Sequence, residues 1–250
     1  MKKKLKLLAT AAAMCQSMFC AIPLPNKAWD DQAEKRMLLF LPLVGLEIGL
    51  IWWGLGMLCR ILKLPTLISA FALAAYPYLV TGYIHLDGFL DVTDAVKSWR
   101  SLERRREILK DSHVGSFAVI ACCLLIVCQT VCFASVDAQA PFGILALIPV
   151  VSRCCAALAV AALPPMHTSQ YAGKKTTAAS YWVPGVFLAA ALAAGWLFWG
   201  KYAICLAATL AGFLLALRRG YRSLQGMNGD ISGYSLTLGE LAGVAALALL

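Results

Sequence analysis

Six long apolar stretches dominate this chain of 250 residues and restrict its fold more than any other feature. They run at about residues 37–59, 64–84, 116–136, 141–163, 183–200 and 202–217, and a shorter seventh occupies about 236–250. A helix of about 20 apolar residues spans a bilayer, because lipid offers unpaired backbone groups no hydrogen-bond partner. The sequence therefore predicts an all-α polytopic membrane bundle of about seven transmembrane helices, in a single domain covering residues 1–250.

The composition agrees with a membrane protein and excludes other classes. Hydrophobic residues make up 61% of the chain and charged residues 14%, whereas a soluble domain has about 45–50% and about 25%. No ten-residue segments alternate in polarity, as the strands of a transmembrane barrel would. All ten cysteines lie in apolar stretches without a CxxC pair, so we expect buried apolar side chains rather than metal ligands.

The basic residues orient the chain. A net charge of +9 is compatible with nucleic-acid binding, but the charges are unevenly placed. Fourteen Lys and Arg lie in four connections, at residues 24–36, 85–115, 164–182 and 218–235. The opposite connections hold only Arg60, Lys63 and Lys201. Because basic loops stay in the cytoplasm, we predict a bacterial inner-membrane protein with these four connections cytoplasmic, a lipid bilayer as partner, and no nucleic acid.

The N-terminal segment 5–24 is apolar but does not fit as a crossing. If it spanned the membrane, the lysines at residues 2, 3, 4 and 6 would lie outside, against the charge rule. We therefore predict an in-plane or re-entrant segment. A signal peptide cleaved near Ala21 is the alternative.

Acidic residues gather at one predicted cytoplasmic connection. Asp87, Asp91 and Asp94 are spaced i, i+4, i+7, which places them on one face of a helix. Three neighbouring carboxylates repel one another unless a cation lies among them, and hard oxygen ligands suit Mg²⁺ or Mn²⁺. No Lys or Arg occurs between Lys63 and Lys97 to neutralise them. These three residues are therefore the predicted metal ligands, in preference to a solvated charged face.

The second half of this connection mixes both signs of charge. Residues 100–111 contain opposite charges at helical spacing, so much of this segment is predicted to be a salt-bridged surface helix that includes Glu103 and at least one arginine. Lys110 and Asp111 close the connection just before the next span. A lysine is a good partner for phosphate, so Lys110 is a candidate catalytic residue, and Arg104 and Asp111 are candidate substrate contacts.

A glycine-rich segment at 226–233 forms the third candidate element. Its free backbone N–H groups are able to cradle a phosphate, and it carries Asp230 on the same membrane face as the other acids. We expect Asp230 to be catalytic, and Asn228 and Gly229 to contact substrate. A plain loop is the alternative on local evidence.

Four further polar residues lie in or beside the spans. His85 is a candidate substrate-binding residue, as an acid/base or a phosphate donor, or else a structural histidine. Glu47 and Arg153 lie within spans and Glu240 begins the last one. Intramembrane charges face a partner or a cavity, so Arg153 is either a substrate contact or the partner of Glu47. Together, these features predict metal-assisted chemistry on a diphosphate or other phosphorylated substrate.

The motifs resemble the cobalamin synthase family, also called adenosylcobinamide-GDP ribazoletransferase. The resemblance is carried in order by His85-Leu86-Asp87-Gly88-x-x-Asp91-x-x-Asp94, by Glu107-Ile108-x-Lys110-Asp111-Ser112-x-x-Gly115-x-Phe117, and by Gly226-x-x-Gly229-Asp230-x-x-Gly233 with Glu240. It also includes Ile22-Pro23-Leu24-Pro25 and Arg153. One departure is Tyr83, which stands where the family often has glycine.

This resemblance implies an inner-membrane enzyme of vitamin B12 assembly. Such an enzyme joins adenosylcobinamide-GDP to α-ribazole, or to its 5′-phosphate, releases GMP and requires Mg²⁺. The resemblance implies a cytoplasmic site in which the three aspartates hold Mg²⁺, Asp91 and Asp94 take part in catalysis, and Asp230 binds a second metal or accepts the hydroxyl proton. Homo-oligomers remain an open alternative to a monomer.

Two other functions compete with this one. CDP-alcohol phosphotransferases and aromatic prenyltransferases also use aspartate clusters at the cytoplasmic face, but their characteristic patterns are absent here. A cation transporter would place its acids at mid-membrane, whereas most acids here lie in the connections.

Overall fold

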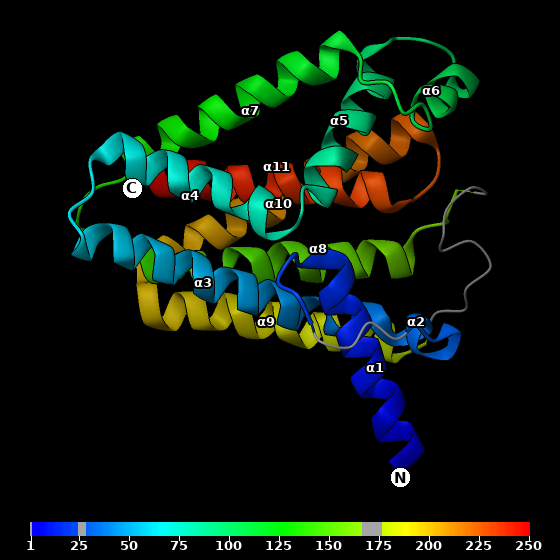
Figure 1. The fold of residues 1–250 in the computed structure, drawn as a ribbon, viewed down its shortest axis with the longest axis horizontal. Helices are drawn as coiled ribbons and strands as arrows, with labels where there is room; N and C mark the ends of the chain where they lie inside the picture. Colours follow the sequence, from blue (N-terminus) through cyan, green and yellow to red (C-terminus); the bar gives the residue numbers. More distant parts are fainter. Residues whose placement is uncertain (1, 25–28, 167–176) are drawn as a thin grey trace.

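The computed structural model describes residues 2–24, 29–166 and 177–250 (Figure 1). Within these residues the chain is helical, and the strand-like pairing is confined to an isolated bridge between Pro165 and Met227. This confirms the all-α class. Four residues used in the sequence comparison or the charge count lie outside the described residues: Pro25, Lys27, Lys174 and Lys175.

Eleven α-helices follow one another along the described residues. They are α1 (Lys2–Phe19), α2 (Asp31–Met37), α3 (Leu41–Ile61), α4 (Thr66–Val80), α5 (Ile84–Lys97), α6 (Leu102–Ile108), α7 (Ser116–Ser135), α8 (Ile148–Ala162), α9 (Ala179–Trp199), α10 (Ile204–Leu224) and α11 (Gly229–Ala248). Short 3₁₀ turns connect some of them: η1 (Leu38–Phe40), η2 (Phe142–Ala146) and η3 (Gly200–Ala203).

The apolar helices form a multi-pass membrane bundle. Five helical segments in the described part of the chain are long and apolar enough to cross a membrane, and the bent pair α4–α5 makes a sixth if it counts as one span. One of the five, Ala179–Leu224, contains both α9 and α10, separated by η3. If α9 and α10 cross separately and the bent pair α4–α5 counts as one span, the total is seven, which is the predicted number.

Helix α8 forms the centre of the bundle, and the outer helices present apolar side chains outward. Eleven of the fifteen residues of α8 are buried, whereas α7 buries only Ala118, Leu125, Gln129 and Phe133. Large exposed apolar side chains follow α3, α4, α7 and α9. So much exposed apolar surface marks a face that contacts lipid.

Helix α1 lies across the bundle and is packed into it. In Figure 1 it runs at a steep angle to α3 and α9, as an in-plane segment would. Ala11, Met14 and Cys15 are buried in the core, and the Ala21 N–H donates to the Val80 carbonyl at 2.7 Å. The segment that was ambiguous from sequence is therefore part of the fold, and its end reaches the start of α5.

Two element boundaries differ from those expected. The stretch 64–84 is not one straight span, because α4 ends at Val80 and α5 turns from it by 90°. Helix α5 thus runs across the direction of α4, at the end of the bundle (Figure 1). The last helix begins at Gly229 rather than near residue 236. The early start follows from Asn228, whose side-chain oxygen accepts the Ile231 N–H at 3.0 Å as an N-cap.

Candidate active site

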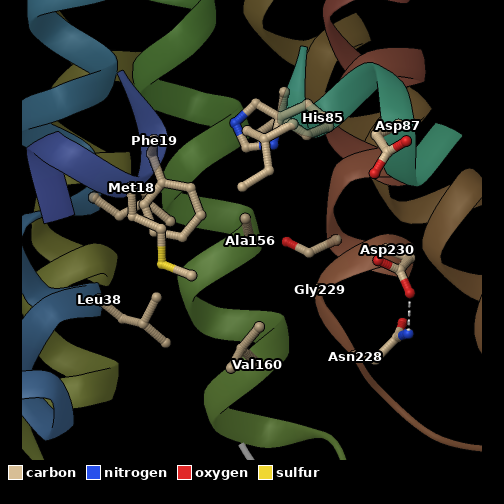
Figure 2. Close-up of a pocket in the computed structure, with 14 residues that line it drawn as sticks. Met18, Phe19, Leu38, His85, Asp87, Ala156, Val160, Asn228, Gly229 and Asp230 are labelled. Carbon is tan, nitrogen blue, oxygen red and sulfur yellow. Dashed lines mark hydrogen bonds between the residues drawn. The ribbon is translucent and has the colours of Figure 1, made fainter. Parts of the chain in front are cut away.

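A cavity of about 370 Å³ opens at the end of the bundle where α5 and α11 begin. Six parts of the chain form its walls: the end of α1, η1, the start of α3, the start of α5, the second half of α8 and the start of α11. In Figure 2, Asp87 and Asp230 lie on one side of this cavity, and Met18, Phe19 and Leu38 lie on the other. The cavity therefore has one acidic wall and one apolar wall.

The aspartates form a cluster without a basic partner in the part of the chain that the structure describes. Asp87, Asp91 and Asp94 share one face of α5, as the spacing predicted. Burial, together with the negative charges of Asp87, Asp230 and Asp94, raises the pKa of Asp91 to about 7. The fourth acid, Asp230, thus comes from a different helix and approaches the same group. The concentrated negative charge of this cluster favours the binding of a cation.

Helices α5 and α11 cross at close range, which is what brings Asp230 to the aspartates of α5. A methyl group on Gly88 would lie 2.8 Å from the Asp230 main-chain oxygen. A methyl group on Gly233 would lie 3.1 Å from the His85 Cα. The Thr237 hydroxyl donates to the His85 carbonyl at 3.3 Å. The glycines of the first and third motifs therefore let two backbones meet.

The second motif contacts the first through Gly115. This residue is the N-cap of α7, and a methyl group there would lie 2.0 Å from Asp94 Oδ2. The Asp94 carboxylate therefore lies against the Gly115 backbone at the start of α7. A helix N-terminus favours a negative charge, so this position suits the carboxylate and fixes where it lies.

The glycine-rich segment is mostly helix rather than loop. Gly229 and Gly233 lie inside α11, so the expected loop over residues 226–233 is confined to residues 226–228, and the rest forms the first turns of the helix. Asn228 and Gly229 do line the cavity. Asn228 Nδ2 donates to Asp230 Oδ2 at 2.6 Å, which holds the carboxylate in the cavity wall (Figure 2).

The arginines of α6 are structural more than catalytic. Arg104 forms an exposed ion pair with Glu107, with a nitrogen–oxygen distance of 2.7 Å. Arg105 donates to the Ser223 carbonyl at 3.2 Å, and Arg106 donates to the carbonyls of Leu224 and Gln225 at 3.0 and 2.8 Å. The last two arginines therefore satisfy carbonyls at the end of α10, which a helix leaves unpaired.

Lys110 and Asp111 lie on the surface after α6, outside the cavity lining. Asp111 accepts hydrogen bonds from the His113 main-chain N–H at 3.0 Å and from His113 Nδ1 at 2.7 Å. These bonds from His113 lower the pKa of Asp111. The structure thus gives Asp111 a local partner, and it does not bring either residue to the aspartate cluster.

His85 lines the cavity and has a free nitrogen. Its side chain is buried, its ring stacks on Phe19 with centroids 6.0 Å apart and planes 12° apart, and Nε2 has no hydrogen-bond partner among the described residues. Burial, and then the charge of Arg153, lowers the pKa of His85 to about 3. A neutral imidazole suits a hydrogen bond better than an ionic contact to phosphate.

Arg153 pairs with Glu240 and not with Glu47. The Arg153 side chain is fully buried on α8, and its Nη1 contacts Glu240 Oε1 from α11. Ser152 Oγ also donates to Glu240 Oε1, at 2.7 Å. Arg153 is not among the residues that line the cavity. The structure therefore corrects the Glu47 pairing and places Arg153 in the core.

The apolar wall was missed from the sequence. Met18 and Phe19 belong to a segment whose path was ambiguous, and Ala156 and Val160 resemble any other residues of a spanning helix. Nothing local distinguishes them from lipid-facing or core positions. Only the crossing of α1 over the bundle makes them part of a site.

The donor set suits a hard cation, although it is not a closed cage. Within residues 2–24, 29–166 and 177–250, no three His, Cys, Asp or Glu side chains converge into a ready-made metal site. Four carboxylates nevertheless influence one another at the end of α5. Oxygen ligands of this kind suit Mg²⁺, which typically uses one or two carboxylates and completes its shell with water and phosphate.

Sequence comparisons match the chain to known proteins over nearly its full length. The sequence model of the cobalamin-5-phosphate synthase family matches residues 11–248. The adenosylcobinamide-GDP ribazoletransferase of Clostridium perfringens (strain SM101 / Type A) is 34% identical, covering 98% of this chain and 100% of the relative. That of Clostridium botulinum (strain Alaska E43 / Type E3) is 31% identical, covering 94% and 96%. No solved structure gives a significant match.

Proposed function

The chain belongs to the cobalamin-5-phosphate synthase family, and on that premise we propose that it is an adenosylcobinamide-GDP ribazoletransferase. It joins adenosylcobinamide-GDP to α-ribazole, or to α-ribazole 5′-phosphate. A ribose hydroxyl oxygen bonds to the phosphorus that carries the cobinamide. The bond from that phosphorus to the bridging oxygen breaks, and GMP leaves with that oxygen.

One observation supports this function best: carboxylates from two helices meet at one cavity. Asp87 from α5 and Asp230 from α11 line the same hollow, and Asp91 lies close enough to both to interact with them electrostatically. A diphosphate substrate brings negative charge, so acids alone would repel it. The arrangement therefore supports chemistry that includes a cation, and family membership favours this transferase over the rival transferases and over a transporter.

Mg²⁺ is the proposed cofactor, held by Asp87, Asp91 and Asp94. When bound, it would neutralise charge on the diphosphate and on the departing GMP. The carboxylate oxygens along α5 fit such an ion by their chemistry, and no described basic side chain pairs with them.

Asp230 is the proposed proton acceptor for the attacking hydroxyl. One of its oxygens accepts from Asn228, which fixes the carboxylate in the wall where the hydroxyl must approach. Asp91 and Asp94 lie on the same face of α5 as Asp87, behind the residues that line the cavity, and Gly229 and Asn228 contact the substrate in the wall. Lys110, Arg104 and Asp111 lie outside the cavity, and we propose that they meet the incoming substrate at its rim.

We also propose on which side of the membrane the site lies and that the whole chain takes part in forming it. The site lies at the end of the bundle where α2, α5 and α6 gather (Figure 1), and we assign this end to the cytoplasmic face of the inner membrane. The whole chain acts as one membrane domain, because the cavity draws residues from α1 to α11.

The direct test supplies detergent-solubilised protein with adenosylcobinamide-GDP, α-ribazole and Mg²⁺. The expected products are cobalamin and GMP, identified by mass. The variants Asp87→Asn and Asp91→Asn should lose most activity across a range of Mg²⁺ concentrations, since an amide binds the ion more weakly than a carboxylate.

The matched control is Asp137→Asn. Asp137 is an exposed acid in the turn between α7 and η2, where its carboxylate accepts the Gln139 N–H at 2.6 Å. Asparagine keeps that acceptor, so activity should be unchanged. Near wild-type activity in both site variants would contradict the metal assignment, and absence of cobalamin from the wild-type reaction would contradict the function.

A further inference from the structure

The cavity at the start of α5 is divided by polarity. Asp87, Asn228 and Asp230 form one wall, whereas Met18, Phe19 and Leu38 form the opposite wall and Ala156 and Val160 lie between them (Figure 2). The reaction needs the acidic wall for the phosphorus and the attacking hydroxyl. The apolar wall has no part in that chemistry and is free to contact another portion of a substrate.

The imidazole ring of His85 lies between the two walls, and one of its nitrogens lacks a hydrogen-bond partner among the described residues. His85 Nε2 is buried and unpartnered in the described part of the chain, and the ring is held parallel to Phe19. Leaving such a nitrogen without a partner is unfavourable. A ligand that brings one polar atom on a flat apolar body would satisfy both features.

The size of the cavity suits the smaller of the two substrates, and a second hollow of about 530 Å³ adjoins it at Met18, Ile84 and Asp87. About 370 Å³ lies near the lower end of the range for small-molecule sites, which is roughly 300–1,000 Å³. A nucleoside with a bicyclic base is of this size, whereas a corrin macrocycle with its peripheral chains is larger. α-Ribazole is such a nucleoside: its benzimidazole base is flat and apolar with one free ring nitrogen, and its ribose carries the reacting hydroxyls.

We propose that the apolar half of this cavity binds the benzimidazole base of the acceptor, between Phe19 of α1 and the face of α8 at Ala156, with His85 Nε2 donating to the ring nitrogen of the base. This inference rests on the proposed function and adds its specificity determinants. The base then points away from the acids while the ribose reaches Asp230. Helix α1 is thereby part of the substrate site as well as of the fold.

The first test is Phe19→Leu, which keeps an apolar side chain but removes the flat ring. Equilibrium binding of α-ribazole alone is followed by the fluorescence of its base, and KM is measured separately for each substrate. The expected result is weaker α-ribazole binding by roughly threefold to tenfold, the range for losing an aromatic contact. The KM for adenosylcobinamide-GDP should change little.

The matched control is Phe71→Leu, the same substitution at an exposed position on α4. It should leave both substrates unaffected. A second variant, His85→Phe, keeps a stacked ring and removes the unpartnered nitrogen. It should weaken α-ribazole binding without lowering the melting temperature, whereas a merely structural histidine would give a less stable protein with unchanged affinity.

The possible outcomes distinguish a failure of the proposed subsite from a failure of the proposed function. Unchanged α-ribazole affinity in Phe19→Leu, or an equal rise in both KM values, would overturn the proposed subsite. If the protein still forms cobalamin and GMP in that case, the proposed transferase function stands. Binding of α-ribazole by the wild type without any product would overturn the function and support the subsite. A wild type that binds no α-ribazole would overturn the subsite, as would a cavity filled by lipid or detergent.

Discussion

Single residues decide how closely backbone and carboxylate approach each other in this site. Gly88 and Gly115 both have ordinary backbone dihedrals, so neither is required for an unusual turn. Their importance is the missing side chain: Asp230 backbone lies against Gly88, and the Asp94 carboxylate lies against Gly115. Each glycine thus sets the position of an acid that comes from another helix.

Gly115→Ala should therefore impair activity more than stability. The added methyl would lie 2.0 Å from Asp94 Oδ2, and the carboxylate is the flexible end of a side chain, so it can rotate away. Misplacing a reacting group by about 1 Å lowers rates on the order of a hundredfold. Product formation should fall by roughly tenfold to a hundredfold, with a melting temperature close to that of the wild type.

Gly54→Ala is the control for this change. Gly54 lies in α3 with nothing within 4 Å of the added methyl, so activity should be retained. If Gly115→Ala also retained full activity, the position of Asp94 would not matter for the reaction.

How far the sequence predicts the site differs from residue to residue. The shared face of Asp87, Asp91 and Asp94 follows from helical periodicity alone, and the structure has it. The stack of His85 on Phe19 joins residues 66 positions apart, and no local pattern encodes it. Tyr83 is intermediate: it departs from a glycine position, and its φ of 65° shows why glycine suits that place.

Elements are best predicted where their ends carry a local signal. The apolar lengths of α3, α7 and α8 gave their approximate bounds, because lipid requires about 20 apolar residues. The start of α11 was placed seven residues too late, since Asp230 and Ser232 look polar for a span. The Asn228 cap and packing against α5 extend that helix to Gly229. Tertiary contact there outweighs local polarity.

Helix α6 stabilises the turn that leads into the site, and Arg106→Ala should show it. Arg106 donates to the carbonyls of Leu224 and Gln225, and hydrogen bonds from a charged donor contribute about 1.5–3 kcal/mol. Losing them should destabilise the end of α10 and disturb Asn228 just beyond it. We expect a lower melting temperature in detergent together with lower activity.

Arg104→Ala provides the comparison on the same helix. Its ion pair with Glu107 is exposed, and such pairs contribute about 0–1 kcal/mol. Its melting temperature should stay near that of the wild type. Equal effects of the two substitutions would argue against a capping role for Arg106.

The whole bundle depends on a buried ion pair between its central helix and its last helix. Arg153 Nη1 of α8 pairs with Glu240 of α11 in the core, with Ser152 as a third member, whereas Arg153 Nε and Nη2 have no partner among the described residues. Glu240→Ala would leave a buried arginine without its counter-charge, which destabilises a protein by about 3–5 kcal/mol. We expect a marked loss of folded protein and of melting temperature.

The double variant Arg153→Met with Glu240→Leu tests whether the charge or the packing matters. Replacing a buried pair with apolar side chains of similar volume is often neutral, so stability should recover toward the wild type. A double variant as unstable as Glu240→Ala would show that the ion pair and its hydrogen bonds stabilise the fold in a way that apolar packing does not replace.

Orientation is the property of the whole molecule that the charges predict most directly. The few basic residues at the end opposite the site have structural partners: Arg60 donates to the Ala140 carbonyl at 2.7 Å and covers the Phe142 ring, and Lys201 Nζ donates to the Leu250 main-chain oxygen at 3.2 Å. The opposite end gathers α2, α5 and α6 (Figure 1). Basic loops stay in the cytoplasm, and this is the reason for proposing that the cavity faces the cytoplasm.

Labelling of intact cells with a membrane-impermeant maleimide checks this orientation. Lys63→Cys lies in the turn after α3, and Ser112→Cys lies beyond α6, both exposed. The first should react in intact cells and the second only in inverted vesicles, with the unsubstituted chain giving the background from its native cysteines. The opposite pattern would put the acid cluster outside the cell, away from a nucleotide-activated substrate. That outcome would overturn the cytoplasmic assignment while leaving the fold and the cavity unchanged.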